Sequence, residues 1–136
     1  MKLNVLLSIY AVVALGFCAG LLLVPAFWIT LYGAKVDPQA TVLLRLTGAL
    51  FGGIGVMTWA GRNAEPSKSH NAMVLGLGVA NSLAAFVAMA GALSGVYNQF
   101  AWGPVATFSV FAVGFVFWWS RSNSGRIENS GNQPAL

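Results

Sequence analysis

The sequence predicts an all-α integral membrane protein, a four-transmembrane-helix bundle with a short interfacial helix after the first span. Hydrophobic residues make up 57% of the 136 residues and charged residues only 7%, whereas a soluble domain carries about 25% charged residues. The apolar residues gather in four runs, each close to the roughly 20 residues that cross a bilayer. The basic residues stand mostly at the ends of these runs. This composition excludes a soluble enzyme fold.

The first run, about residues 3–24, is expected to be a membrane helix that Pro25 ends or kinks. Lys2 before an apolar stretch is also typical of a signal peptide. The run is too long for one, however, and continues without polar relief through Tyr32, so we expect a retained helix. Between residues 26 and 32 the large apolar side chains fall on one helical face, which predicts a short helix lying in the membrane interface.

Three further spans follow along the chain. The second covers about residues 38–60, where Asp37 is a suitable N-cap and Pro38 fits the first helical position. The third covers about residues 71–92 and the fourth about residues 102–120. The chain therefore contains four predicted spans joined by short links.

The spans make one predicted transmembrane domain, residues 1–120. The remaining residues, 121–136, are polar and rich in Ser, Asn and Gly. Such a composition cannot bury enough apolar surface to fold, so we expect a disordered tail on the cytoplasmic side.

The charge distribution predicts the orientation of the spans. With four spans both termini lie on the same side of the membrane. The other side carries a single basic residue, Lys35. The shared side carries five basic residues, which are Lys2, Arg62, Lys68, Arg121 and Arg126. The positive-inside rule then places both termini in the cytoplasm. We expect the membrane to be a bacterial inner membrane.

Small residues on two helices predict close helix packing, because lipid gives no hydrophobic reward for association and backbones must approach closely. The second helix carries Gly48 and Gly52 as a GxxxG pair. Leu77 lies off the small positions of the third helix and is expected to face lipid. The third helix carries a small residue at every fourth position: Ala72, Gly76, Ala80, Ala84, Ala88 and Ala92. These positions serve packing within one bundle or, alternatively, an interface with another subunit.

Arg45 is a basic residue inside a predicted span, about 10 Å below the start of its helix. Either it snorkels to lipid phosphate or Asp37, or it is a buried cation that holds an anion, a quinone-type carbonyl or a partner subunit. Asn81, Ser82 and Ser109 lie at similar depths, so these three residues and Arg45 form a candidate intramembrane polar cluster. Asn81 also fits a purely structural hydrogen bond between helices.

The sequence offers no catalytic, cofactor-binding or metal-binding site. His70, the single histidine, stands beside the loop before the third span, and one loop histidine supports neither haem nor a metal. The glycines of residues 52–55 lie inside a helix, which argues against a nucleotide-binding loop. Cys18 has no partner for an internal disulfide and is expected to be a small buried residue. We therefore predict no enzyme activity, no cofactor and no nucleic-acid partner.

Residues 44–55, Leu-Arg-Leu-Thr-Gly-Ala-Leu-Phe-Gly-Gly-Ile-Gly, resemble the second-helix pattern of small bacterial four-helix membrane proteins of the DoxX-like type. The four-span layout is similar over about residues 1–120. The resemblance implies an accessory role, since DoxX-like members have been associated with redox membrane complexes. It assigns no catalytic residue.

These observations predict a non-enzymatic accessory or assembly subunit of a larger membrane complex, with lipid and other membrane subunits as partners. The alternative is a small channel or transporter for an anion or small solute that uses Arg45 as the attracting charge. A membrane enzyme or quinone-handling subunit lacks supporting residues.

The charge bias makes a direct topological prediction. Impermeant thiol reagents applied from outside should label Lys35→Cys and Asn98→Cys but not Lys68→Cys or Ser130→Cys, because only the first pair lies on the outer side. The reverse labelling pattern would contradict the orientation.

Overall fold

The computed structural model describes residues 2–65 and 67–131, with side chains described as far as residue 122. The described chain contains four helices that are long and apolar enough to cross a membrane, and a short helix after the first of them. The predicted fold class is therefore confirmed. The elements are α1 (Leu3–Leu23), α2 (Pro25–Leu31), α3 (Pro38–Gly61), α4 (Lys68–Leu93), the 3-10 helix η1 (Gln99–Ala101) and α5 (Trp102–Gly131).

The ends of the helices follow local sequence signals. Pro25 occupies the first position of α2, and the chain turns at Val24 between α1 and α2. The Oδ2 atom of Asp37 accepts a hydrogen bond from the Ala40 amide at 3.0 Å, which confirms the predicted cap of α3. α4 begins earlier than expected because Ser67 caps it, its hydroxyl accepting from the His70 amide at 3.0 Å. His70 therefore lies in the first turn of a helix and not beside a loop.

α5 continues beyond the predicted fourth span. Its apolar run ends at Trp119, where polar residues begin, yet the backbone remains helical to Gly131. Residues 121–131, for which we expected a disordered tail, are thus helical, which suits a segment that directly prolongs a formed helix. Residues 132–136 of that expected tail lie outside the described residues.

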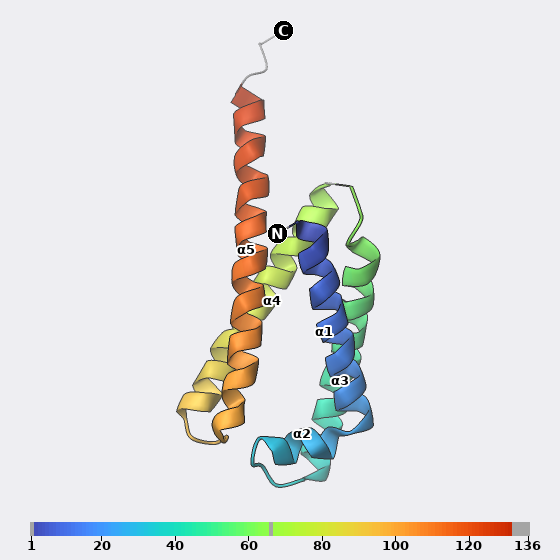
Figure 1. Ribbon diagram of the computed structural model, residues 1–136, viewed down its shortest axis with the longest axis vertical. Helices are drawn as coiled ribbons and strands as arrows, with labels where there is room; N and C mark the ends of the chain where they lie inside the picture. Colours follow the sequence, from blue (N-terminus) through green and yellow to red (C-terminus); the bar gives the residue numbers. More distant parts are fainter. Residues whose placement is uncertain (1, 66, 132–136) are drawn as a thin grey trace.

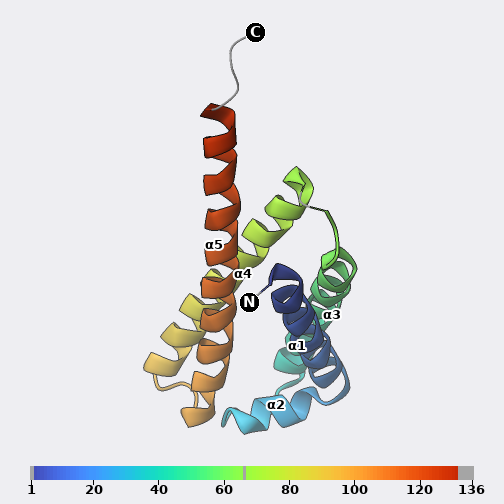
Figure 2. The same ribbon diagram turned by 45° about the horizontal axis from the view of Figure 1, so that its top comes forward.

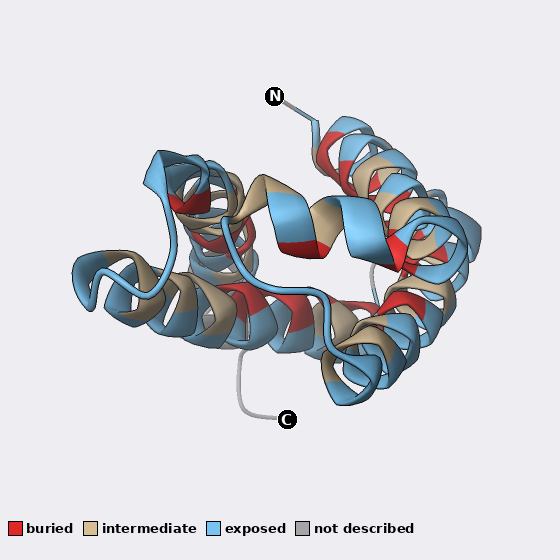
Figure 3. Ribbon diagram, turned by 90° about the horizontal axis from the view of Figure 1, so that it is seen from below, coloured by how far each residue is buried: buried red, intermediate tan, exposed pale blue. Residues whose placement is uncertain are grey.

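The helices form two antiparallel pairs, with α1 beside α3 and α4 beside α5 (Figures 1 and 2). The start of α1, the end of α3, the start of α4 and the end of α5 lie at the same end of the molecule, which we call the terminal end (Figure 1). α2 and η1 lie at the opposite end, where α2 crosses between the two pairs (Figure 3). Buried residues lie mainly on the inner sides of the helices (Figure 3).

Glycines bring α1 and α3 into close contact. A Cβ atom added to Gly48 would lie 3.0 Å from the Leu21 Cβ and 3.3 Å from the Cys18 carbonyl oxygen. One added to Gly52 would lie 2.8 Å from the Cys18 Sγ. The predicted GxxxG pair therefore packs against α1, and Cys18 is a half-buried side chain within this contact.

The small residues that recur at every fourth position of α4, from Ala72 to Ala92, form a stripe, the small stripe, that lies in two environments. Ala72, Gly76 and Ala80 are exposed, and a Cβ on Gly76 would meet nothing within 4 Å. The remaining members are half-buried: Ala84, Ala88 and Ala92. The cause is geometric, because each four-residue step advances about 40° round a helix of 3.6 residues per turn.

A different stripe of α4 is buried. It consists of His70, Val74, Leu77, Gly78 and Asn81. Gly78 packs on α5, where an added Cβ would lie 3.3 Å from Val116. The expectation that Leu77 faces lipid is therefore wrong, because its side chain is only 4% exposed and belongs to the core.

The two pairs share one hydrophobic core towards the terminal end. Leu6, Leu7 and Tyr10 of α1 contact aliphatic residues of α4 and two phenylalanines of α5 in this core. The core members from α4 and α5 are Val74, Leu77, Phe111 and Phe115. Phe115 and Leu7 are completely buried, at 0% exposure.

At the opposite end, Asn98 joins the link before η1 to the end of α2. Its Nδ2 atom donates to the Leu31 carbonyl at 2.8 Å, and its amide donates to the Tyr32 carbonyl at 3.2 Å. Gly33 adopts a φ of 80° beside Asn98, a conformation that favours glycine.

The glycine contacts predict opposite effects for two alanine substitutions in α3. Gly48→Ala should destabilise the protein by about 1–3 kcal/mol, because its methyl group is pressed against α1. Gly53→Ala is the matched control, because a Cβ there meets nothing within 4 Å and helix propensity improves. Thermal unfolding in detergent measures both, and equal midpoints for the two variants would contradict this packing.

Candidate functional site

The predicted intramembrane polar cluster is not assembled around Arg45. The Arg45 side chain is exposed, and it makes no hydrogen bond or ion pair with any other described residue. Phe51 of α3 stacks on Phe108 of α5, with ring centroids 6.4 Å apart. Arg45 lies about 120° from Phe51 round α3 at 3.6 residues per turn. Seven residues separate Arg45 from Gly52, so Arg45 lies on the face of α3 that turns towards α1 and away from the α5 contact.

The predicted partners of Arg45 have other surroundings. The Ser82 hydroxyl donates to the Gly78 carbonyl of its own helix at 2.8 Å. Ser109 on α5 is half-buried. Asp37, suggested as a partner of a snorkelling Arg45, caps α3 instead. Equal depth in the membrane did not bring these side chains together.

Asn81 forms a polar contact between the two helix pairs. It is 1% exposed, and its Nδ2 atom donates to the Tyr10 hydroxyl oxygen at 3.1 Å and to the Leu77 carbonyl at 2.8 Å. The Tyr10 ring meets Phe111 and Phe115 edge-on, at centroid distances of 4.8 and 5.1 Å. Asn81 thus makes the interhelical hydrogen bond predicted for it, and its partner is Tyr10 of α1.

A second group of aromatic side chains lies nearer the opposite end, where α2 packs on the membrane helices. Phe17 contacts Phe51 on one side and Trp28 of α2 on the other, at 5.6 and 5.5 Å between ring centroids. Trp28 in turn stacks on Tyr32 at 6.3 Å. Burial raises the pKa of the Tyr32 hydroxyl above its usual value. The contact between Phe17 and Trp28 therefore packs α2 against α1.

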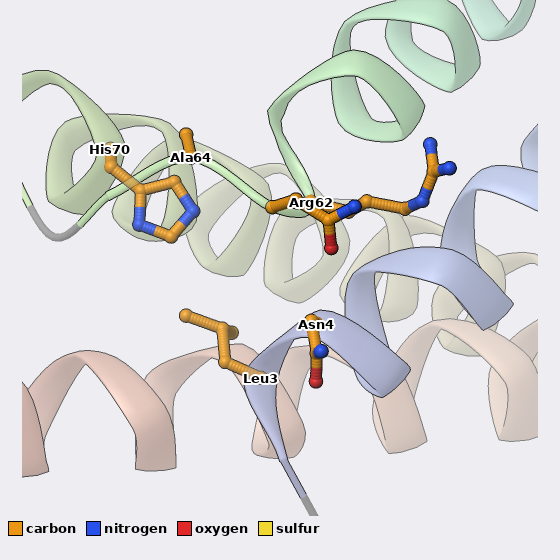
Figure 4. Close-up of a pocket in the computed structure, with 6 residues that line it drawn as sticks. Leu3, Asn4, Arg62, Ala64 and His70 are labelled. Atoms are coloured by element: carbon orange, nitrogen blue, oxygen red, sulfur yellow. The ribbon is translucent and has the colours of Figure 1, made fainter.

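A pocket of about 380 Å³ lies at the terminal end. It is lined by Leu3 and Asn4 of α1, by Arg62, Asn63 and Ala64 after α3, and by His70 of α4. Figure 4 shows the His70 imidazole facing this hollow from the α4 side, with Leu3 and Asn4 across from it. Residues from three segments therefore line one hollow.

His70 is the buried member of this pocket. Its side chain is 8% exposed, and its Nε2 atom is buried with no hydrogen-bond partner among the described residues. A buried polar atom without a partner costs about 1–3 kcal/mol. The pocket therefore contains an unused hydrogen-bonding atom.

Arg62 stands at the rim of the pocket. Its guanidinium lies 3.7 Å from the Trp59 ring centroid and donates to the Trp59 carbonyl. In Figure 4 the guanidinium extends away from His70. Most of its five N–H donors remain available to a ligand.

The described residues contain no group of three or more His, Cys, Asp or Glu side chains that could hold a metal ion. Comparison of the chain with family models, with curated proteins and with solved structures finds no match. The resemblance to DoxX-like proteins therefore stays a prediction.

Two features of these sites were missed from the sequence. His70 was interpreted as a loop residue because the Ser67 cap was not recognised, although a serine three residues before it is a usual helix start signal. No role was predicted for Tyr10. Its position well inside the first span was the signal available.

Proposed function

We propose that this four-span membrane protein is a non-enzymatic accessory or assembly subunit of a larger membrane complex. The observation that supports this proposal most is that three members of the small stripe on α4 are exposed. Ala72, Gly76 and Ala80 are exposed, although small side chains of this kind are typical of helix–helix contacts in lipid. Another transmembrane helix can approach this face closely, because a Cβ at Gly76 has no neighbour within 4 Å.

The charge asymmetry supports an orientation for this subunit. The side chains of Lys2, Arg62, Lys68 and Arg121 belong to the terminal end, and Lys35 belongs to the opposite end. We infer that the terminal end lies in the cytoplasm and that the membrane is a bacterial inner membrane. The exposed face of α4 then offers a docking surface within the membrane.

The alternative, an anion channel or transporter built on Arg45, has less support. Arg45 lies on the flank of α3 that turns away from α5, and the other members of the predicted cluster do not approach it. Snorkelling to lipid phosphate accounts for its exposed position.

Native co-purification with two matched variants tests the proposed function. Gly76→Leu should remove most of the partner that co-purifies with the wild-type protein in mild detergent, because the leucine blocks close approach of a helix. Gly53→Leu is the control and should retain the partner. An added Cβ at Gly53 also meets nothing within 4 Å, but Gly53 is not part of the small stripe on α4. Mass spectrometry quantifies the partner, and thermal unfolding confirms that both variants are folded.

Two results would contradict the proposal. One is a wild-type protein that purifies alone from its native membrane. The other is retention or loss of the partner to the same extent in both variants.

A further inference from the structure

We propose that the pocket at the terminal end binds a phosphate group, and that this group is the headgroup of an anionic phospholipid. Six residues line the pocket, and among them Arg62 carries a formal positive charge while none is acidic. His70 contributes an imidazole whose Nε2 atom is buried without a partner. The pocket thus combines a cation, a free ring nitrogen and side-chain amides, which are the groups that bind phosphate oxygens.

The position of the pocket favours a lipid as the source of the phosphate. It lies where α1 begins, α3 ends and α4 begins, so it is at the level of the ends of three membrane helices. Trp59 beside Arg62 is an aromatic residue of the kind that marks the headgroup region. Lys2 and Lys68 are exposed at the same end, as is Glu65. With Arg62 they leave this end net positive, which attracts anionic lipids.

The lining also matches the two parts of a phospholipid. Leu3 and Ala64 give the pocket apolar atoms that suit the glycerol and the first methylenes of an acyl chain. Asn4 and Asn63 are exposed and make no side-chain hydrogen bond to other described residues, so their amides are available to ester and phosphate oxygens.

Binding requires two small side-chain movements. Leu3 is half-buried at the first position of α1, and its displacement gives a phosphate oxygen access to the Nε2 atom of His70. Arg62 leaves the Trp59 carbonyl and extends to the same phosphate. The headgroup then supplies the hydrogen-bond partner that Nε2 lacks in the unliganded chain.

The test measures thermal unfolding of the purified protein in neutral detergent with three additions: phosphatidylglycerol, phosphatidylcholine and inorganic phosphate. Phosphatidylglycerol should raise the unfolding midpoint of the wild-type protein, whereas phosphatidylcholine should raise it far less. Inorganic phosphate distinguishes the source: a shift with the lipid alone supports a headgroup site, and an equal shift with inorganic phosphate contradicts the lipid assignment.

Variants connect the shift to the pocket. His70→Phe keeps a ring of similar size but lacks Nε2, so the apparent affinity for phosphatidylglycerol should fall about tenfold, as for loss of one charge-assisted hydrogen bond. Its stability without lipid should not fall, because an unpartnered buried nitrogen is removed. Arg62→Gln should weaken lipid binding to a similar degree.

Arg121→Gln is the matched control for Arg62→Gln. Arg121 is also at the terminal end and also lies over an aromatic ring, 4.8 Å from the Phe117 centroid, but it does not line the pocket. Its replacement should leave the lipid effect unchanged. The proposal is overturned if phosphatidylglycerol stabilises the His70→Phe and Arg62→Gln variants as strongly as the wild type, or if Arg121→Gln has the same effect as Arg62→Gln.

Discussion

The contact of Asn81 with Tyr10 is the interaction on which the rest of the molecule depends. α1 and α3 form one helix pair and α4 and α5 the other. This hydrogen bond joins the two pairs where Tyr10 belongs to the core that they share. In lipid, apolar side chains gain nothing by leaving solvent, so association relies on close packing and on polar bonds. The edge-on contacts of Tyr10 with Phe111 and Phe115 supply the packing, and Asn81 supplies the bond.

The inward orientation of Asn81 sets the rotation of α4 about its axis, and two surfaces follow from that rotation. His70, Val74 and Leu77 fall on the same buried stripe as Asn81, so His70 is turned into the pocket at the terminal end. Gly76 and Ala80 fall on the other side and are exposed. The rotation of α4 therefore places the proposed lipid site on one side of the helix and the proposed partner surface on another.

The number of spans and the ends of the first two could be predicted from the sequence, but the start of α4, the end of α5 and the faces that the helices bury could not. Span lengths, the cap at Asp37 and the break at Pro25 depend on local chemistry, which is readable residue by residue. A membrane helix is apolar on all sides, so hydrophobic periodicity does not reveal its inner face, and Leu77 was assigned to lipid for that reason. The one strong polar marker in the middle of α4, Asn81, was the better guide to that face. The cluster around Arg45 failed because equal depth says nothing about direction, and α4 crosses α5 at an inclination (Figure 2).

A double-mutant cycle between Tyr10→Phe and Asn81→Leu tests this account most directly. The coupling free energy of unfolding in detergent or bicelles should be about 0.6 kcal/mol, the average measured for hydrogen bonds between membrane helices, and at most about 1.7 kcal/mol. A second cycle that combines Tyr10→Phe with Thr58→Val should show coupling near zero, since the buried Thr58 hydroxyl donates to the Ile54 carbonyl of its own helix at 2.7 Å. Additive effects of Tyr10→Phe and Asn81→Leu would contradict the central role of this contact.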